Sequence, residues 1–217
     1  MANVQQKGYC YCCGVELGKT AMKNHILKEH AAGTEKCCLV KIEGMDKNYW
    51  LYVDMPLRAT LNSLDRFLRR IWLECCGHMS AFMGAGYTEI GKARKLENLA
   101  PGSKLRYEYD FGDTTELTIT LMDPTERPAQ REAVRLLARN KPFVFECGLC
   151  EKPAVYVDQE RMYGGEYPFL CEECAEKDGA EMLLPITNSP RMGVCAYTGE
   201  LDDYEFDPEK FAGVPGK

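Results

Sequence analysis

The sequence lacks the features that would direct the chain into or across a membrane. It contains no run of about 18 consecutive apolar residues, so no transmembrane helix is expected. Its start, MANVQQKGYC, has no apolar segment behind a charged beginning, so no secretory signal is expected either. We therefore expect a cytoplasmic protein without membrane association. In a reducing compartment, its twelve cysteines are expected to be free thiols or metal ligands and not a disulfide framework.

The signatures of phosphate-loop and kinase chemistry are also missing. Gly84 and Gly86 form a G-x-G pair without a third glycine, which is weak as a phosphate loop. The D-F-G triplet at 110–112 spells the magnesium-binding triplet of protein kinases, but no Gly-rich loop, strand lysine or H-R-D segment accompanies it. We interpret Asp110 and Asp113 as residues that end a strand and shape a turn.

Positive charge is scarce at the C-terminal end. Residues 1–42 carry six lysines and three glutamates, a balance of +3. Residues 43–146 are balanced, and residues 147–217 carry six basic and fifteen acidic residues, a balance of −9. Because nucleic-acid binding depends on basic residues, such contact is expected at the N-terminal segment only.

The first metal-ligand pattern lies at this basic end. Cys10 and Cys13 form a C-x-x-C pair, and His25 and His30 have the H-x(3–5)-H spacing of a zinc-finger helix. Eleven residues separate the two pairs, one fewer than is usual. Thr20 is a plausible N-cap for the helix. The pattern predicts a two-Cys two-His zinc finger.

The second pattern supplies four cysteines as two C-x-x-C pairs separated by twenty residues: Cys147, Cys150, Cys171 and Cys174. This spacing is typical of zinc ribbons. The residues between the pairs predict a hairpin that turns at Gly164-Gly165, and a helix is expected to begin at the second pair. Four thiolates leave no open coordination position, so the expected role is structural, in a ribbon or treble-clef module.

The central segment predicts an α+β domain. Two strands are expected around the turn at residues 45–47, a helix from Thr60 to Trp72, and a hairpin formed by KLRYEYDFG and TTELTITLMD. Residues 125–144, charged and punctuated by proline, predict a linker with a short helix.

Over roughly residues 37–123, the chain resembles the plasmid pRiA-type Orf-three-like family, whose members are also named as insertion-element passengers after a resolvase. The matching stretches are Thr60 to Trp72, Cys75 to Phe82 and Tyr109 to Asp113. The usual family pattern has Trp and His shortly after D-F-G-D, where this chain has Thr115 and Leu117. The resemblance implies a roll-like domain with an antiparallel sheet and a packed helix, in a protein of a mobile element. It supplies no activity.

These patterns divide the chain into four parts. We expect a zinc-finger module at 1–35, the Orf-three-like α+β domain at 36–124, a linker with a short helix at 125–144, and a four-Cys zinc module with an acidic end at 145–217. The expected cofactor is zinc, as two structural ions.

The remaining cysteines leave alternatives open. Three interpretations fit Cys75, Cys76 and His78. They form a nucleophile with its base, or they are isolated metal ligands, or they end the helix in a tight turn where the cysteines pack as small apolar residues. Cys195 is a free thiol or a contact of the ribbon. Cys12 could exchange with a neighbouring cysteine as ligand. Cys37 and Cys38 open a strand, so one thiol is expected to face the core and the other its opposite side.

Three functions fit the sequence. The first is a non-enzymatic zinc protein, nucleic-acid-associated or regulatory, which contacts its partner weakly through the finger lysines Lys19, Lys23 and Lys28. The second is a protein-interaction adaptor that uses the acidic zinc module. The third is an enzyme with a cleft formed by His78 and Asp110 or Asp113. The sequence does not give the partner, any sequence preference or the oligomeric state.

Overall fold

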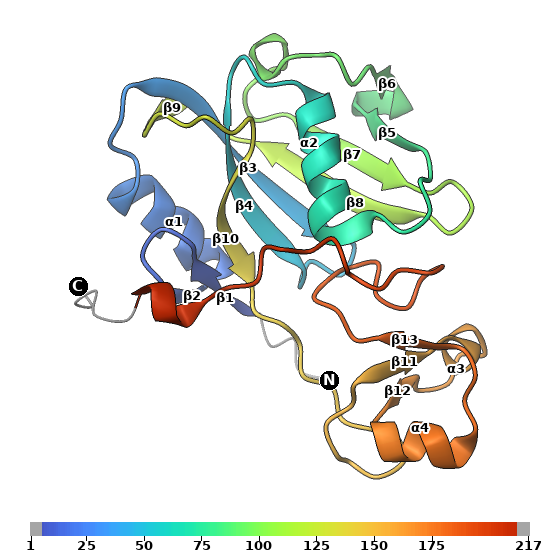
Figure 1. Cartoon of the computed structure of the whole chain (residues 1–217). Coiled ribbons are helices and arrows are strands. Elements are labelled where there is room, and N and C mark those ends of the chain that lie inside the picture. The colour runs from blue at the N-terminus through green and yellow to red at the C-terminus, as the bar shows by residue number, and fades with distance from the viewer. Residues whose placement is uncertain (1–5, 212–217) are drawn as a thin grey trace. The chain divides into compact units, whose positions relative to one another are not determined.

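The computed structural model describes residues 6–211 (Figure 1), and two compact units make up this part of the chain. The first unit takes the described parts of Met1–Leu68, Met79–Lys141 and Tyr204–Lys217. The second takes Arg69–His78 and Pro142–Asp203. In this described range, no helix has the length and apolar character needed to cross a membrane.

A large antiparallel sheet forms the first unit. Its order is β2-β1-β10-β4-β3-β8-β7-β5-β6, and β9 pairs with β3. The strands, in chain order, are β1 (Lys7–Cys10), β2 (Glu16–Gly18), β3 (Glu35–Gly44), β4 (Trp50–Pro56), β5 (Ser80–Met83), β6 (Glu89–Ile90), β7 (Lys104–Tyr109), β8 (Thr115–Leu121), β9 (Thr125–Arg127) and β10 (Arg135–Asn140). With few helices beside this sheet, the expected α+β class with a central antiparallel sheet is confirmed.

Two hairpins and one helix of the central segment were predictable from local patterns and are confirmed. β3 pairs with β4, and β7 pairs with β8. Burial alternates along β7 and β8, so one face of that hairpin is covered and the other is open. Helix α2 (Leu61–Leu68) follows Thr60, whose Oγ1 accepts a hydrogen bond from the Ser63 N–H (3.3 Å), as expected of an N-cap.

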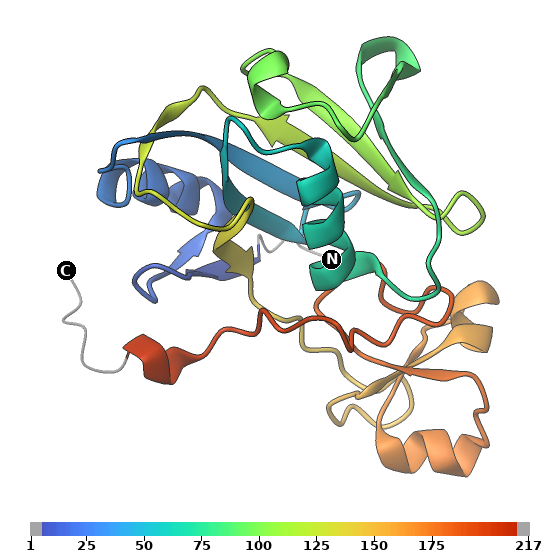
Figure 2. The same cartoon turned by 45° about the horizontal axis from the view of Figure 1, so that its top comes forward.

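Helix α2 lies across one face of the sheet, as two views show (Figures 1 and 2). Three leucines of this helix, Leu61, Leu64 and Leu68, are fully buried. Beyond Leu68 the chain continues as the π-helical turn η1 (Arg69–Leu73). Shorter 3-10 turns occur at η2 (Ala85–Tyr87), η3 (Leu96–Asn98) and η4 (Pro208–Phe211).

The prediction for residues 125–144 was wrong. No helix forms there; β9 pairs with β3, and β10 lies between β1 and β4 inside the sheet. Two of the charges that suggested an exposed linker are paired within the fold, because Arg127 and Arg135 both donate to the carboxylate of Asp54 on β4. Pairing with distant strands therefore overrides the local composition.

The finger segment belongs to the sheet and does not stand apart. β1 pairs with β2 on one side and with β10 on the other, so residues of the expected 1–35 and 36–124 parts fall in one unit. Helix α1 (Lys19–Glu29) begins directly after β2, with Gly18 at the N-cap and no side-chain capping bond. Thr20 therefore lies inside the helix and is not its cap.

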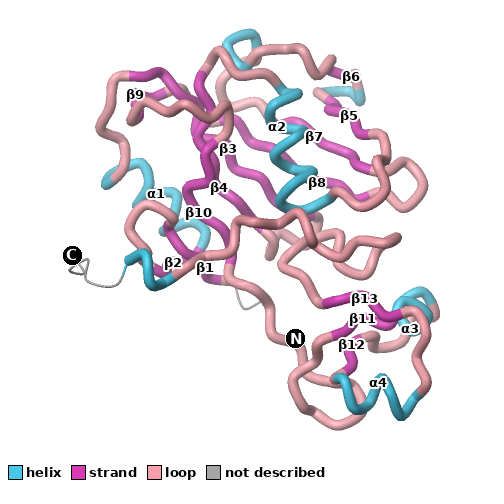
Figure 3. The backbone as a smooth tube through the Cα atoms, viewed as in Figure 1, coloured by secondary structure: helices cyan, strands magenta, loops and turns pink. Residues whose placement is uncertain are grey.

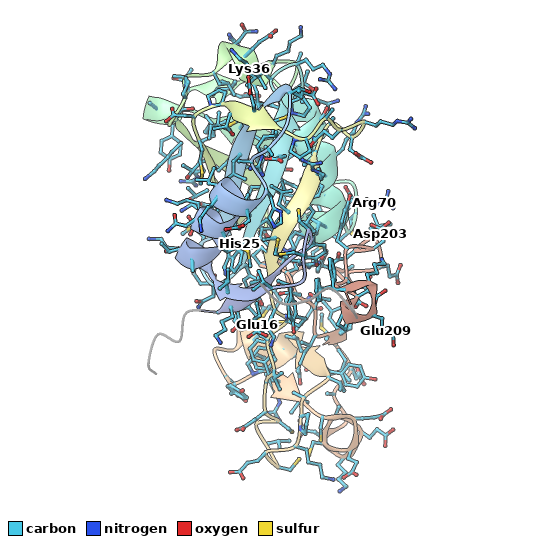
Figure 4. The ribbon with its side chains drawn as sticks, turned by 90° about the vertical axis from the view of Figure 1, so that its left-hand side faces the viewer. Glu16, His25, Lys36, Arg70, Asp203 and Glu209 are labelled. Atoms are coloured by element: carbon cyan, nitrogen blue, oxygen red, sulfur yellow. The ribbon has the colours of Figure 1, made fainter. Side chains whose placement is uncertain are left out.

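The second unit contains a small sheet of order β12-β11-β13. Its elements are β11 (Tyr156–Asp158), α3 (Gln159–Tyr163), β12 (Phe169–Leu170), α4 (Glu172–Asp178) and β13 (Leu183–Pro185). β11 and β12 pair as predicted, but the first strand ends at Asp158 and α3 follows it, where the sequence predicted strand up to residue 160. The predicted helix begins after Cys171. After β13 the chain runs mainly as loop (Figure 3). In this loop, Asp203 pairs with Arg70 (Figure 4), whose Nε lies 2.9 Å from Asp203 Oδ1.

A buried carboxylate fastens α2 to the sheet. Asp65 Oδ1 accepts hydrogen bonds from Ser80 Oγ (2.6 Å), Lys92 Nζ (2.9 Å) and Tyr107 Oη (2.8 Å). Burial alone would raise the pKa of Asp65, but these three donors outweigh it and the net pKa is lowered from its ordinary value of 3.8.

Replacing Asp65 with asparagine is expected to destabilise the first unit by about 2 kcal/mol, because charge-assisted hydrogen bonds are lost. The folded pKa lies below the unfolded one, so the stabilisation is complete above about pH 5 and is lost as the pH falls through the folded pKa. Denaturant unfolding between about pH 3 and pH 7 checks this. The variant's stability should change less across this range than that of the wild type. Equal slopes would contradict the assignment.

Candidate metal centres

The first centre is built by a hairpin and the helix that follows it. β1 ends at Cys10, and the tight turn after it brings Cys13 back, with Gly14 at a φ of +76° and its N–H donating to Cys10 O (2.8 Å). His25 projects from α1 (Figure 4), and His30 is the residue that ends this helix. The ligand atoms of the two cysteines and two histidines all lie within 4.8 Å of one another.

The separations are close to those around a single tetrahedral ion, and two of them are slightly shorter. Cys10 Sγ lies 3.5 Å from His30 Nε2, Cys13 Sγ lies 3.2 Å from His25 Nε2, and the two Nε2 atoms are 3.1 Å apart. Four N and S ligands around one tetrahedral ion are separated by roughly 3.3–3.8 Å, given bonds of about 2.0–2.3 Å. The structure therefore brings together all four residues predicted for this centre, in a geometry that can hold a metal ion.

This centre is continuous with the core of the sheet. Met22 and Ile26 of α1 are fully buried and belong to one apolar cluster with Cys10, Leu39, Trp50, Tyr52, Leu137 and Ala138. Arg127 NH1 donates to Ile26 O (3.2 Å) in the last turn of α1, just before His30. The position of His30 thus depends on packing contributed by several strands.

The second centre joins the four predicted cysteines of the second unit. Their sulfur atoms all lie within 4.8 Å of one another, and Cys150 Sγ is 3.5 Å from Cys171 Sγ. Cys147 and Cys150 lie on a turn, Cys171 is the N-cap of α4, and Cys174 is in its first turn. A knuckle and a helix that each carry two ligands match the predicted ribbon or treble-clef arrangement.

Two cysteines of the second centre shift in opposite directions: hydrogen bonds from the other thiols raise the pKa of Cys174 to about 12, whereas the backbone favours a thiolate at Cys147. Burial raises the pKa of Cys147, but the backbone N–H groups of Cys171 and Leu149 counter this, and the net pKa falls to about 6. The centre also forms the core of its module, because Cys147 and Cys171 are buried beside Leu170 and Ala175. A module of this size with so few apolar residues depends on its ligands for stability.

All twelve cysteines lie in the described range, and none forms a disulfide there. Cys37 and Cys38 are buried in β3, and the Cys38 thiol donates to Met122 O (3.1 Å). Burial raises the pKa of Cys38 to about 11, so this thiol stays protonated and packs as a small apolar residue. Cys12 is exposed beside the first centre and borders a cavity of about 240 Å³ with Arg127 and Arg135.

A third group of ligand-type side chains was not predicted as a set. Cys75, Cys76 and His78 meet Cys195, and their ligand atoms also lie within 4.8 Å of one another. A hydrogen bond with His78 lowers the pKa of the Cys195 thiol to about 7. No local spacing pointed to Cys195, because it lies 117 residues beyond His78 in the chain.

His78 and Asp110, which the enzyme hypothesis places in one cleft, each have another partner. His78 Nε2 lies 3.4 Å from Cys195 Sγ, which gives the ring a thiol neighbour. Asp110 has a φ of +64° and accepts a hydrogen bond from the Gly112 N–H (3.0 Å), as expected of a residue that shapes a turn. The interpretation of Asp110 as a turn residue is confirmed.

The three predicted contact lysines of α1 have different surroundings. Lys19 Nζ lies 2.5 Å from Glu43 Oε1 and donates to Lys47 O, so its charge is already engaged. Lys23 lines a groove between α1 and the sheet. Lys28 has a side chain that is 83% exposed and pairs with Glu29 (3.2 Å).

Comparison with known proteins gives no assignment. The chain matches no known family profile and no curated protein. The solved structures that it resembles include a protein of unknown function from Methanosarcina mazei Go1, at 17% identity and a TM-score of 0.42. The similarity covers 49% of this chain and 70% of that one.

Proposed function

We propose that the chain is a non-enzymatic zinc-binding protein that contacts the phosphate backbone of a nucleic acid through the groove beside its finger helix. Cys10, Cys13, His25 and His30 would hold one zinc ion, and the four cysteines of the second unit would hold another. Thiolate and imidazole ligands in closed tetrahedral sets suit zinc. Each set leaves no position for a water molecule, which supports a structural role.

The groove is the observation that carries the nucleic-acid proposal. It has a volume of about 580 Å³ and runs between α1 and the strands β3 and β8. Three lysines line it, Lys19 and Lys23 from α1 and Lys41 from β3, together with Thr20 of α1. Lysine and threonine side chains at this density suit phosphate oxygens, which position a protein without reporting base sequence.

The charge of the groove sets the expected affinity. Glu43 lies between Lys19 and Lys41, 2.5 Å from one ammonium group and 2.6 Å from the other. Burial raises the pKa of Glu43, but both lysines donate to it and the net pKa is lowered, so the carboxylate stays charged. With Asp123 also lining the groove, the lysines keep a small positive excess. Binding should therefore be weak, with a Kd of roughly 10⁻⁴–10⁻⁶ M at physiological salt.

The finger helix itself offers little for reading bases. Zinc fingers that read duplex DNA use the residue before the helix and its third and sixth residues, for about 3 base pairs per finger. In α1 these positions hold Gly18, Ala21 and Asn24, of which only Asn24 has a side chain that forms hydrogen bonds. Binding should therefore be largely indifferent to sequence.

The double variant Lys23→Gln/Lys41→Gln is expected to weaken binding of a fluorescent 20-base-pair duplex about tenfold and to reduce its salt slope by about 2. Fluorescence anisotropy over a range of salt concentrations measures both values. The matched control is Lys95→Gln, an exposed lysine outside the groove, which should bind like the wild type. Metal content should be unchanged in both variants.

Three results would overturn the proposal. The first is a wild type that shows no binding at low salt, and the second is a double variant that binds as the control does. The third is one sharply defined motif selected from random duplexes, which would replace the backbone-binding role with specific recognition.

A second candidate, a protein-interaction adaptor, has one observation in its favour. The acidic second unit exposes large apolar side chains beside its metal centre, among them Leu149 and Tyr167. A basic partner protein with an apolar patch would complement both the negative charge and the exposed apolar side chains of this unit. A pull-down from native lysate with and without nuclease separates the candidates, because an adaptor keeps its protein partner after nuclease treatment.

A further inference from the structure

Four ligand-type side chains from two distant stretches meet within the second unit. Cys75, Cys76 and His78 follow the helical turn η1, and Cys195 lies in the long loop after β13 (Figure 3). Both stretches belong to the same compact unit. The sequence assigned them to different parts of the chain and gave no reason for them to meet.

The separations match those of a tetrahedral metal site. Cys76 Sγ lies 3.8 Å from Cys195 Sγ, and His78 Nε2 lies 3.4 Å from the same sulfur. Ligands around one zinc ion are expected at roughly 3.7–3.8 Å for two sulfurs and 3.5 Å for a sulfur and a nitrogen. A disulfide needs a distance of about 2.05 Å, so two thiols at this separation are not bonded.

Hydrogen bonds fix the turn at residues 74–78, which follows η1 and carries three of the four ligands. The Glu74 carboxylate accepts from Arg69 NH1 (2.6 Å) and from the Gly77 N–H (2.6 Å), which shapes the turn that carries the three ligands. Arg69 NH2 also donates to His78 O (2.6 Å). Gly77 has a φ of +72°, a conformation that a side chain would disfavour.

The loop that carries Cys195 is also fixed by hydrogen bonds. Gln159 Nε2 donates to Gly193 O (2.9 Å) and Cys195 O (2.7 Å), and it is itself buried. Cys195 has a φ of +54°, an uncommon conformation for a residue with a side chain. Residues held in such conformations cluster at functional sites, where the surrounding structure fixes them. Here the conformation aims the thiol at His78 and Cys76.

A buried cation completes the arrangement. Arg191 is 0% exposed, and its Nη2 donates to Cys75 Sγ (3.4 Å). Ser189 holds the same segment, accepting from the Arg191 N–H (2.9 Å) and donating to Trp72 O (2.6 Å). Three thiolates around one divalent ion leave one net negative charge, which a guanidinium group neutralises. Such outer contacts orient and tune metal ligands.

We propose that Cys75, Cys76, His78 and Cys195 hold a third zinc ion, in addition to the two of the proposed function. The three-Cys one-His set is closed, so this ion is structural and ties the turn at residues 74–78 to the loop at residues 189–197. Unlike the other two centres, this one has no buried ligand, and Cys76 is exposed. The third ion should therefore be the first to leave when a chelator is added.

Metal analysis of the full chain, purified with zinc and a reductant present, tests the proposal. The wild type should contain three zinc ions, and Cys195→Ser should contain two. The matched control is Cys12→Ser, which removes an exposed cysteine outside the three centres and should keep three ions. A wild type with two ions, or a Cys195→Ser variant with the wild-type content, overturns the proposal.

If Cys195→Ser does not fold, two other measurements test the third site: a variant with a different ligand, and the alkylation rates of the thiols. His78→Cys supplies a fourth thiolate and should retain the third ion, with stronger sulfur-to-cobalt charge-transfer absorption after cobalt replaces zinc. In the wild type, alkylation of Cys75, Cys76 and Cys195 should be slow until a chelator is added. Equal alkylation rates with and without chelator, or a mass that shows a Cys76–Cys195 disulfide under reducing conditions, would refute the third site.

Discussion

Replacing Cys171 with serine is expected to unfold the four-cysteine module. Metal binding contributes on the order of 10 kcal/mol in structural zinc sites, and most of that is folding free energy. Cys171 has three roles here: it is a ligand of the second centre, the N-cap of α4, and a buried member of the module's small apolar core. A hydroxyl group does not replace the thiolate as a zinc ligand, so the ion and the core are lost together.

Hydrogen exchange followed by mass spectrometry measures this loss segment by segment. In Cys171→Ser, amides of β11, β12 and α4 should lose protection, while β3, β4 and β8 of the first unit keep theirs. Cys12→Ser is the control and should leave both groups protected. Persistent protection of α4 after loss of the ion would show that the module folds without metal.

The two predicted candidate metal centres could be recognised in the sequence because their ligand pairs are local. C-x-x-C spacing is set by one tight turn, and His25 and His30 lie on and at the end of one helix, so eight ligands are recognised without knowledge of the fold. The same holds for the β3–β4 and β7–β8 hairpins, whose strands are joined by short turns.

The parts that could not be predicted depend on distant partners. RLLARN at 135–140 resembles a short charged helix until β1 and β4 pair with it on either side. Cys195 has no other cysteine or histidine in its own loop, and only the fold brings it to His78. The finger segment likewise has a complete local ligand pattern, but it belongs to the sheet only because β1 pairs with β10.

The ion pair between Asp54 and Arg127 is almost fully buried. Their side chains are 0% and 1% exposed. Arg127 Nε lies 3.1 Å from Asp54 Oδ1 and 3.0 Å from Oδ2, and Arg135 NH2 lies 2.9 Å from Oδ2. Through Ile26 O, Arg127 also holds the last turn of α1, next to the metal ligand His30. The pair therefore links β4 and β9 to the first centre.

Replacing Asp54 with alanine is expected to destabilise the first unit by about 3–5 kcal/mol, because it leaves the Arg127 guanidinium buried without its carboxylate. Chemical denaturation measures this, and a chelator should then remove the first-centre ion faster, because the turn before His30 loosens. Glu97→Ala breaks the exposed Lys95–Glu97 pair and should cost less than about 1 kcal/mol. The double variant Asp54→Ala/Arg127→Met removes both charges and should recover part of the loss. A cost for Asp54→Ala no greater than that of Glu97→Ala would show that the buried pair does not stabilise the sheet.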